Sequence, residues 1–167
     1  MRHFSAMTYR VELKDQTRRD VAVVCFRATA SDMGRHMGTA LGTVYEHLVR
    51  AGVKSQGLAV AIYRSTGVEA QFDVRVGFVV PSAIRGDGHV VPAELPECEA
   101  AVVLHVGPYD RLHFAYDAIR SWMAETGYEP TELMWEEYFS PPPTPPAKMR
   151  TQVVWPVRPR ASARTAA

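Results

Sequence analysis

Two adjacent carboxylates in an otherwise apolar stretch are the residues of this sequence best suited to chemistry. Glu136 and Glu137 lie within Leu133–Ser140, which reads LMWEEYFS. Successive residues of a β-strand point to opposite faces of a sheet, so a central strand here cannot leave both carboxylates in solvent. An unpaired charge in an enclosed apolar environment is costly. This conflict between side-chain chemistry and burial predicts a functional site at this strand.

A desolvated Glu136 has two chemical roles open to it. As a carboxylate it can pair with a cationic ligand on which Trp135, Tyr116 or Tyr109 stacks, each good cation–π contact contributing about 0.5–2 kcal/mol. With a pKa raised by burial, it can instead act as a general base that activates water or as a general acid. The hydroxyl of Tyr138 can orient the carboxylate in either role, or the residue can simply pack in the strand. The sequence leaves these roles open.

An internal repeat places Glu136 in a structural context. An offset of 75 residues aligns the stretch Leu58–Ser65 (LAVAIYRS) with Leu133–Ser140. The same offset aligns two sets of apolar residues at i, i+3, i+4, i+7 and i+11, a spacing typical of the buried face of a helix. Ala61 occupies the position equivalent to Glu136, so the carboxylate is a departure from the repeated framework.

Strand alternation predicts which side chains share a face. In the first copy, Leu58, Val60 and Ile62 indicate the face that points to the core. Transferred to the second copy, this pattern puts Trp135 and Glu137 on the core side. The other face, predicted to look into a cleft, carries Met134, Glu136 and Tyr138. The alternative for Glu136 is a solvated strand residue paired with an arginine, and Glu137 can also reach solvent or cap the helix layer.

Aromatic residues outside this strand complete the candidate site. Tyr116 occupies an apolar stripe position on a predicted helix, where it either packs in the core or lines a pocket. Tyr109 follows a strand at a turn, from which an aromatic ring can swing into a cleft. Phe26 is expected mainly to pack. The candidate ligand-binding residues are Glu136, Tyr138, Trp135, Tyr109, Tyr116, Met134, Glu137 and Phe26, with Glu136 and Tyr138 as catalytic residues if the protein is an enzyme.

The elements that must position these residues follow the same order in both halves of the chain. Apolar alternation and apolar runs predict strands at 9–14, 21–26, 58–65, 69–80, 89–94, 99–106, 133–140 and 149–157. Capping residues and glycines delimit two helices at about 32–51 and 110–126. Each half therefore consists of strand, strand, helix, strand and strand. This order predicts an α+β fold with a mainly antiparallel eight-stranded sheet and two helices on one face.

The predicted domain organisation is a single unit with a tail. The domain covers residues 8–157, with pseudo-repeats at about 8–81 and 88–157, and residues 158–167 are expected to be disordered. Tandem copies usually meet at a pseudo-twofold axis, where a cleft is a natural ligand site. Three glycines recur every fourth residue in the first helix, at Gly34, Gly38 and Gly42. They indicate either close approach by backbone or ligand, or composition alone.

Composition excludes several classes of function. The 167 residues are 47% hydrophobic and 22% charged, with a formal net charge of +1, which gives no electrostatic case for binding nucleic acid or a membrane surface. Cys25 and Cys98 are isolated and the N-terminus lacks the apolar core of a signal peptide, so we expect a cytoplasmic protein with reduced thiols. Phosphate-binding loops, HExxH and nucleophile-elbow motifs are absent, and the histidines lack ligand spacing. We therefore expect no metal and no cofactor.

The ordered set of motifs resembles the GyrI-like small-molecule-binding domain, which is also the effector-binding half of AraC-type and MerR-type multidrug regulators. The resemblance covers about residues 8–157. The matching features are Gly107-Pro108-Tyr109, Tyr116 and Trp122 on the second helix, Trp135-Glu136-x-Tyr138, the later proline loop and the closing strand 151–157, with Tyr63 and Phe72–Phe78 in the first half.

The resemblance implies a concave aromatic pocket with Glu136 at its base. Members of the family bind hydrophobic cations and other drug-like molecules, some stand-alone members are similar to hydrolases of cyclopropane-bearing alkylating natural products, and one inhibits DNA gyrase. No helix-turn-helix domain is present in this sequence, so we expect no direct contact with DNA. The leading hypothesis is a stand-alone domain that binds hydrophobic aromatic ligands, cations included. The alternatives are a hydrolase with Glu136 as general acid or base, and an interaction protein whose partner is gyrase or a separate regulator.

Overall fold

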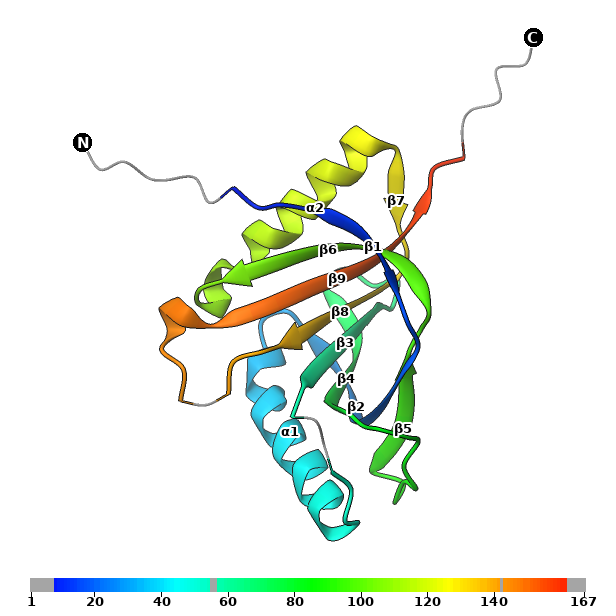
Figure 1. The fold of residues 1–167 in the computed structure, drawn as a ribbon, viewed down its shortest axis with the longest axis vertical. Helices are drawn as coiled ribbons and strands as arrows, with labels where there is room; N and C mark the ends of the chain where they lie inside the picture. The colour runs from blue at the N-terminus through cyan, green and yellow to red at the C-terminus, as the bar shows by residue number, and fades with distance from the viewer. Residues whose placement is uncertain (1–7, 55–56, 142, 162–167) are drawn as a thin grey trace.

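A nine-stranded antiparallel sheet carries two helices on one of its faces in the computed structural model, which describes residues 8–54, 57–141 and 143–161 (Figure 1). The elements of the first half are β1 (Glu12–Gln16), β2 (Arg19–Thr29), α1 (Met33–Arg50), β3 (Ala59–Ser65) and β4 (Gln71–Val79). Those of the second half are β5 (Val90–Leu95), β6 (Cys98–Val106), the 3-10 turn η1 (Tyr109–Arg111), α2 (His113–Thr126), β7 (Tyr128–Pro130), β8 (Leu133–Tyr138), the 3-10 turn η2 (Pro146–Lys148) and β9 (Arg150–Pro159). The predicted α+β class is confirmed.

The order of the strands joins the two halves at the centre of the sheet. The order is β1-β6-β9-β8-β3-β4-β2-β5, and the short β7 pairs with β9. The first strand of each half pairs with a strand of the other half: β1 pairs with β6, and β5 pairs with β2. In the central β3–β8 pair, Ala61 lies opposite Glu136, its equivalent in the repeat. The approximate twofold axis that relates the halves therefore passes between these two residues.

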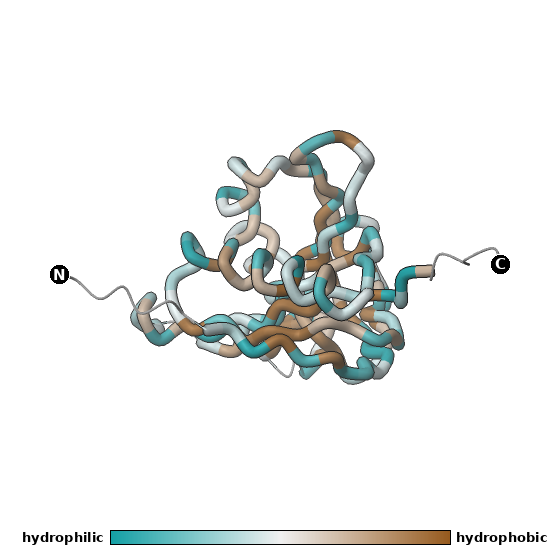
Figure 2. Tube along the Cα trace, turned by 90° about the horizontal axis from the view of Figure 1, so that it is seen from above, coloured by the Kyte–Doolittle hydropathy of each residue, from teal (hydrophilic) through white to brown (hydrophobic). Residues whose placement is uncertain are grey.

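Apolar side chains cover both faces of the central strands. On one face, α1 buries Ala40, Val44 and Leu48 against the first half of the sheet, and α2 does the same in the second half. The opposite face has its own core, in which Trp135 is fully buried among apolar residues of several strands. In Figure 2 the most hydrophobic residues are concentrated in the strands, whereas the helices alternate between hydrophobic and hydrophilic residues. Side chains in the middle of β8 are thus buried on both faces, Glu136 on one and Trp135 and Glu137 on the other.

Several local features differ from those predicted. The second helix is preceded by a separate 3-10 turn, so Asp110 lies within that turn and is not the N-cap of α2. Gly127 ends α2 with a φ of 77°, a left-handed conformation that favours glycine, as predicted. The three-residue β7 was not predicted, because a strand this short has no readable alternation. The strand β9 continues to Pro159, two residues into the predicted tail, and residues 162–167 lie outside the described part of the chain.

The glycines of α1 make no close approach to another part of the described chain. A Cβ placed at Gly34, Gly38 or Gly42 would meet no heavy atom within 4 Å, and all three positions are exposed. Close packing of backbone therefore does not explain their spacing. Among the described residues, no helix combines the length and the hydrophobicity needed to span a membrane.

Candidate functional site

Glu136 lies at the centre of the sheet, on the face that the helices cover. The alternation of β8 directs its side chain away from the Trp135 side, and the small Ala61 opposite leaves space for it. Only 7% of the residue is exposed. The position on the repeat axis that holds a methyl group in the first half therefore holds a buried carboxyl group in the second.

Three tyrosine hydroxyls surround this carboxyl group. Tyr116 of α2 donates to Oε1 at 2.5 Å, Tyr63 of β3 donates to Oε2 at 3.3 Å, and Tyr138 of β8 also donates to Oε2. The hydroxyls of Tyr63 and Tyr138 are 3.5 Å apart. A strand of each half and the second helix thus converge on one group, and both of its oxygens accept hydrogen bonds.

The cluster holds a buried acidic group with no counter-ion among the described residues. Burial raises the pKa of Glu136, although the hydrogen bonds from Tyr116, Tyr138 and Tyr63 act in the opposite direction. Burial, followed by the nearby Glu136 charge, raises the pKa of all three tyrosines well above the usual value, so they remain neutral donors. Glu136 forms no ion pair with any residue that the structure describes.

Aromatic rings extend from this centre toward the surface. Tyr109, which is 48% exposed, packs its ring edge-on against Tyr138 at a centroid distance of 5.9 Å. Burial and the Glu136 charge raise the pKa of Tyr109. On the other side, Tyr116 packs edge-on against Trp155 at 5.8 Å. The carboxyl group is therefore enclosed by rings, and Tyr109 links the cluster to solvent.

One polar group beside this cluster has no partner. The hydroxyl of Thr151 is buried and makes no hydrogen bond with the described residues. Thr151 lies on β9, directly opposite Tyr138. A buried hydroxyl without a partner is uncommon and marks a place where a further polar group can bind.

Glu137 has very different surroundings, although it is the next residue. It is 3% exposed and lies on the opposite face of the sheet. Its carboxylate forms an ion pair with Arg19, accepts a hydrogen bond from Trp135 Nε1 at 3.1 Å and another from Gln152 Nε2 at 3.3 Å. A cation and two neutral donors thus satisfy Glu137 within the chain.

The structure brings together five of the eight predicted site residues. On the helix side lie Glu136, Tyr138, Tyr116, Tyr109 and Met134, the last packed between the cores beneath α1 and α2. Trp135 and Glu137 lie on the other face, as the parity argument required, and their side chains make no hydrogen bond with the Glu136 carboxyl group. Phe26 packs beneath α1 and against His36 at a ring distance of 5.5 Å.

Sequence reasoning left Tyr63, Trp155 and Thr151 out of the candidate set. Tyr63 is named from the sequence only among the features of the family resemblance, although the repeat offset makes it the equivalent of Tyr138. That equivalence was the available signal, because two residues related by an axis between Ala61 and Glu136 both lie beside that pair. No sequence signal indicates Trp155 or Thr151, since both belong to a strand whose pairing with β8 has to be known first.

A hollow of about 670 Å³ lies on the face of the sheet opposite to Glu136. It is lined by residues of β2, β3, β4 and β8 and of the β5 region, and it does not include Glu136. The hollow and the buried carboxyl group are therefore separate features. We take Glu136 as the candidate site because its buried carboxyl group has no counter-ion among the described residues. Among the described residues, no three His, Cys, Asp or Glu side chains are grouped as a metal ion requires.

Comparison with known proteins agrees with this geometry. The model of a protein family described as the GyrI-like small molecule binding domain matches residues 9–158. A search of curated protein sequences gives no match. Among solved structures, the C-terminal domain of EcmrR is 22% identical, with a TM-score of 0.78 over 92% of this chain and 99% of that domain.

Two further structures show the same fold. EcmrR in a complex with DNA is 21% identical, with a TM-score of 0.79 over 95% of this chain, which spans 60% of the EcmrR chain. SAV2435 bound to tetraphenylphosphonium is 12% identical, with a TM-score of 0.62 over 91% of this chain and 94% of that protein. At these identities the likeness is one of fold.

Proposed function

Because the chain belongs to the family of GyrI-like small molecule binding domains, we propose that it binds a hydrophobic organic cation beside Glu136, in a cleft between its two halves. One observation carries the proposal. The carboxyl group of Glu136 is buried among three tyrosine donors, and no cation of the described residues lies beside it to balance its charge. A ligand that brings a positive charge and apolar surface supplies what this site lacks.

The aromatic rings around Glu136 favour such a ligand. A cation over the face of a tyrosine ring gains about 0.5–2 kcal/mol, most where water is excluded. A bound cation also stabilises the ionised carboxylate, so the pKa of Glu136 falls when the ligand binds. The hydroxyl of Thr151, buried beside Tyr138 with no partner in the described part of the chain, is available to a polar group of the ligand.

The exposed rings at the edge of the cluster provide an entrance. Tyr109 is half exposed and touches Tyr138, whose hydroxyl covers Glu136. We place the entrance at Tyr109. Rotation of the Tyr109 and Tyr138 side chains uncovers the carboxyl group without moving a strand. SAV2435, which has the same fold, binds the hydrophobic cation tetraphenylphosphonium, and that molecule is a suitable probe for this chain.

Calorimetric titration with tetraphenylphosphonium tests the proposal. We expect binding by the unaltered protein and a loss of affinity of at least tenfold, equivalent to about 1.4 kcal/mol, in Glu136→Gln. Glu137→Gln is the matched control, since it removes the neighbouring buried carboxylate on the other face. Thermal unfolding of each variant confirms that it is folded at the temperature of the titration. Equal affinities of Glu136→Gln and the unaltered protein would exclude a role for this carboxylate.

The hydrolase alternative rests on the same residue. A buried carboxyl group with a raised pKa is suited to general acid–base catalysis. Incubation with a cyclopropane-bearing alkylating compound, followed by mass spectrometry, separates the two functions. Formation of a water adduct that is lost in Glu136→Gln supports a hydrolase, and binding without a product supports the binding domain. A cytoplasmic location and a protein partner such as gyrase or a separate regulator remain predictions.

A further inference from the structure

The hollow on the helix-free face of the sheet has the dimensions of a ligand site. Its volume of about 670 Å³ lies within the range of about 300–1,000 Å³ typical of small-molecule sites. Strand alternation explains its position, because Ala61 and Tyr63 of β3 face the helices, whereas Ile62 and Arg64 face the hollow. The hollow therefore uses the same central strands as the Glu136 cluster, from the other side.

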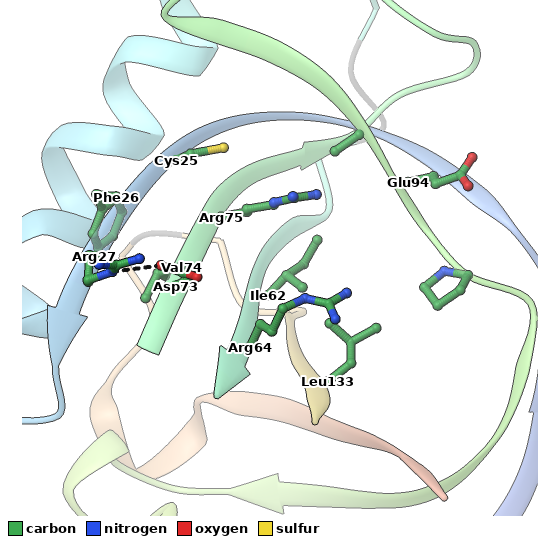
Figure 3. A pocket seen from close by; sticks show the side chains of 12 residues that line it. Cys25, Phe26, Arg27, Ile62, Arg64, Asp73, Val74, Arg75, Glu94 and Leu133 are labelled. Carbon is green, nitrogen blue, oxygen red and sulfur yellow. Dashed lines mark hydrogen bonds and ion pairs between the residues drawn. The ribbon is translucent and has the colours of Figure 1, made fainter. Parts of the chain in front are cut away.

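Three arginines from three adjacent strands stand around this hollow, together with two carboxylates. Arg27 pairs with Asp73 at 2.9 Å, and Arg64 pairs with Glu132 at 2.7 Å. The guanidinium of Arg75 forms no hydrogen bond or ion pair with the described residues. In Figure 3 the side chains of Arg64 and Arg75 extend into the space between their strands and the segment that carries Glu94.

The carboxylates of the hollow are already paired. Besides Asp73, the second carboxylate is Glu94, which is bound by Arg18 at 2.6 Å. The nearest cross-strand neighbours of Arg75 are Cys25 and Ile62, which are both uncharged. The guanidinium of Arg75 therefore offers an unbalanced positive charge, with hydrogen-bond donors arranged to bind a carboxylate or sulfonate by two parallel bonds.

An apolar surface lies next to this charge. Ile62 is 5% exposed, and Leu133 and Ala93, which also line the hollow, pack against the same apolar cluster. A ligand that covered Leu133 and Ala93, which are only partly buried, would remove apolar surface from water, at roughly 25 cal/mol per Å². The hollow thus combines the unpaired guanidinium of Arg75 with an apolar surface.

We propose that this hollow is a second ligand site, which binds a small amphipathic organic anion. The acidic group of the ligand pairs with Arg75, and its aromatic or aliphatic body lies on Ile62, Leu133 and Ala93. This preference is opposite in charge to that of the Glu136 site. The two sites lie on opposite faces of β3 and β8, so each can be occupied without the other.

Fluorescence titration of the full chain with anilinonaphthalene sulfonate, an aromatic anion, tests this proposal. We expect the affinity to fall at least fivefold in Arg75→Gln. Arg50→Gln is the matched control, because Arg50 is also exposed and without a partner among the described residues but lies at the end of α1, on the other side of the sheet. An equal affinity in Arg75→Gln and the unaltered protein, both shown by circular dichroism to be folded, would overturn the assignment.

A second variant tests the apolar part of the site without altering a charge. Ala93→Trp places a large ring over the hollow and should weaken binding of the same probe at least fivefold. If Arg75→Gln and Ala93→Trp both bind as the unaltered protein does, the probe lies elsewhere and the proposal is wrong.

Competition between probes separates this site from the one at Glu136. Saturating tetraphenylphosphonium should leave the titration with anilinonaphthalene sulfonate unchanged. Displacement of the anion by the cation would place both probes in one site and would overturn the second site. If tetraphenylphosphonium does not bind at all, the proposed function fails, whereas dependence of anion binding on Arg75 still decides the second site.

Discussion

Glu136 and Glu137 are neighbours in sequence, are buried to a similar degree, and differ in how their charge is balanced. Glu137 is 3% exposed and is paired with Arg19, so its surroundings are complete within the chain. Glu136 is 7% exposed, and among the described residues it accepts hydrogen bonds from neutral hydroxyls only. Burial of a carboxylate therefore does not by itself mark a ligand site. Glu136 differs from Glu137 in that no cation of the described residues pairs with it.

The largest expected effect is on the Glu137 side. Arg19→Met leaves a buried carboxylate without its cation and should lower the free energy of unfolding by about 3 kcal/mol, measured by urea denaturation. Arg18→Met is the control, because the Arg18–Glu94 pair is exposed and should contribute less than about 1 kcal/mol.

A double variant sharpens this prediction. Glu137→Met added to Arg19→Met removes the unpaired charge and should restore most of the lost stability, since an apolar pair can replace a buried ion pair. A loss below about 1 kcal/mol in Arg19→Met alone would show that the donors Trp135 and Gln152 suffice, and the contrast with Glu136 would disappear.

The second prediction is a gain in stability, not a loss, and the size of the gain depends on pH. Burial raises the pKa of Glu136, so between its ordinary and its raised value the folded state holds a proton that the unfolded state has released. The stability contributed by Glu136 is therefore present at low pH and is lost as pH rises through the raised pKa. Glu136→Gln carries no charge and should be more stable than the unaltered protein at neutral pH and above, by about 1 kcal/mol.

Thermal unfolding between about pH 4 and pH 8 measures this difference. The gain in Glu136→Gln should grow with pH, because only the unaltered protein must bury a charge on ionisation. A difference that stays constant over this range would mean that Glu136 does not titrate there in the folded protein.

Much of this comparison could be predicted from the sequence. The repeat offset and strand alternation were sufficient to predict that Glu136 and Glu137 point to opposite faces, and that Ala61 is the equivalent of Glu136. Both features depend on local periodicity, which is set by backbone geometry. The same periodicity predicted the α+β class and the apolar faces of both helices.

The partners that balance the charges could not be predicted in this way. Arg19 lies 118 residues before Glu137, and their contact depends on the way distant strands pack over the helix-free face. The hollow near Arg75 likewise depends on the curvature of the sheet and on the return of β5 to pair with β2. Hydrophobic patterning specifies which side of a strand is buried, but not which distant strand covers it.

The third effect concerns the hydrogen bond that Tyr116 donates to Glu136. Tyr116→Phe removes the 2.5 Å hydrogen bond to Oε1, and this should cost about 1 kcal/mol of stability. The lost bond had favoured the ionised form, so the pKa of Glu136 should rise further. NMR titration of the labelled Glu136 carboxyl carbon measures the change. Tyr128→Phe is the control, because Tyr128 stacks on Trp122 at 5.2 Å and its hydroxyl makes no hydrogen bond with the described residues.

The smallest effect separates the two tyrosines that the repeat relates. Tyr63 and Tyr138 both donate to Oε2, but the Tyr63 bond is long, at 3.3 Å. Tyr63→Phe should therefore cost less than about 0.5 kcal/mol and Tyr138→Phe about twice as much, measured by urea denaturation. Equal losses would mean that the carboxyl group lies symmetrically on the repeat axis. A larger loss for Tyr138→Phe supports a group held mainly by the second half, with the Tyr63 side free to yield to a bound cation.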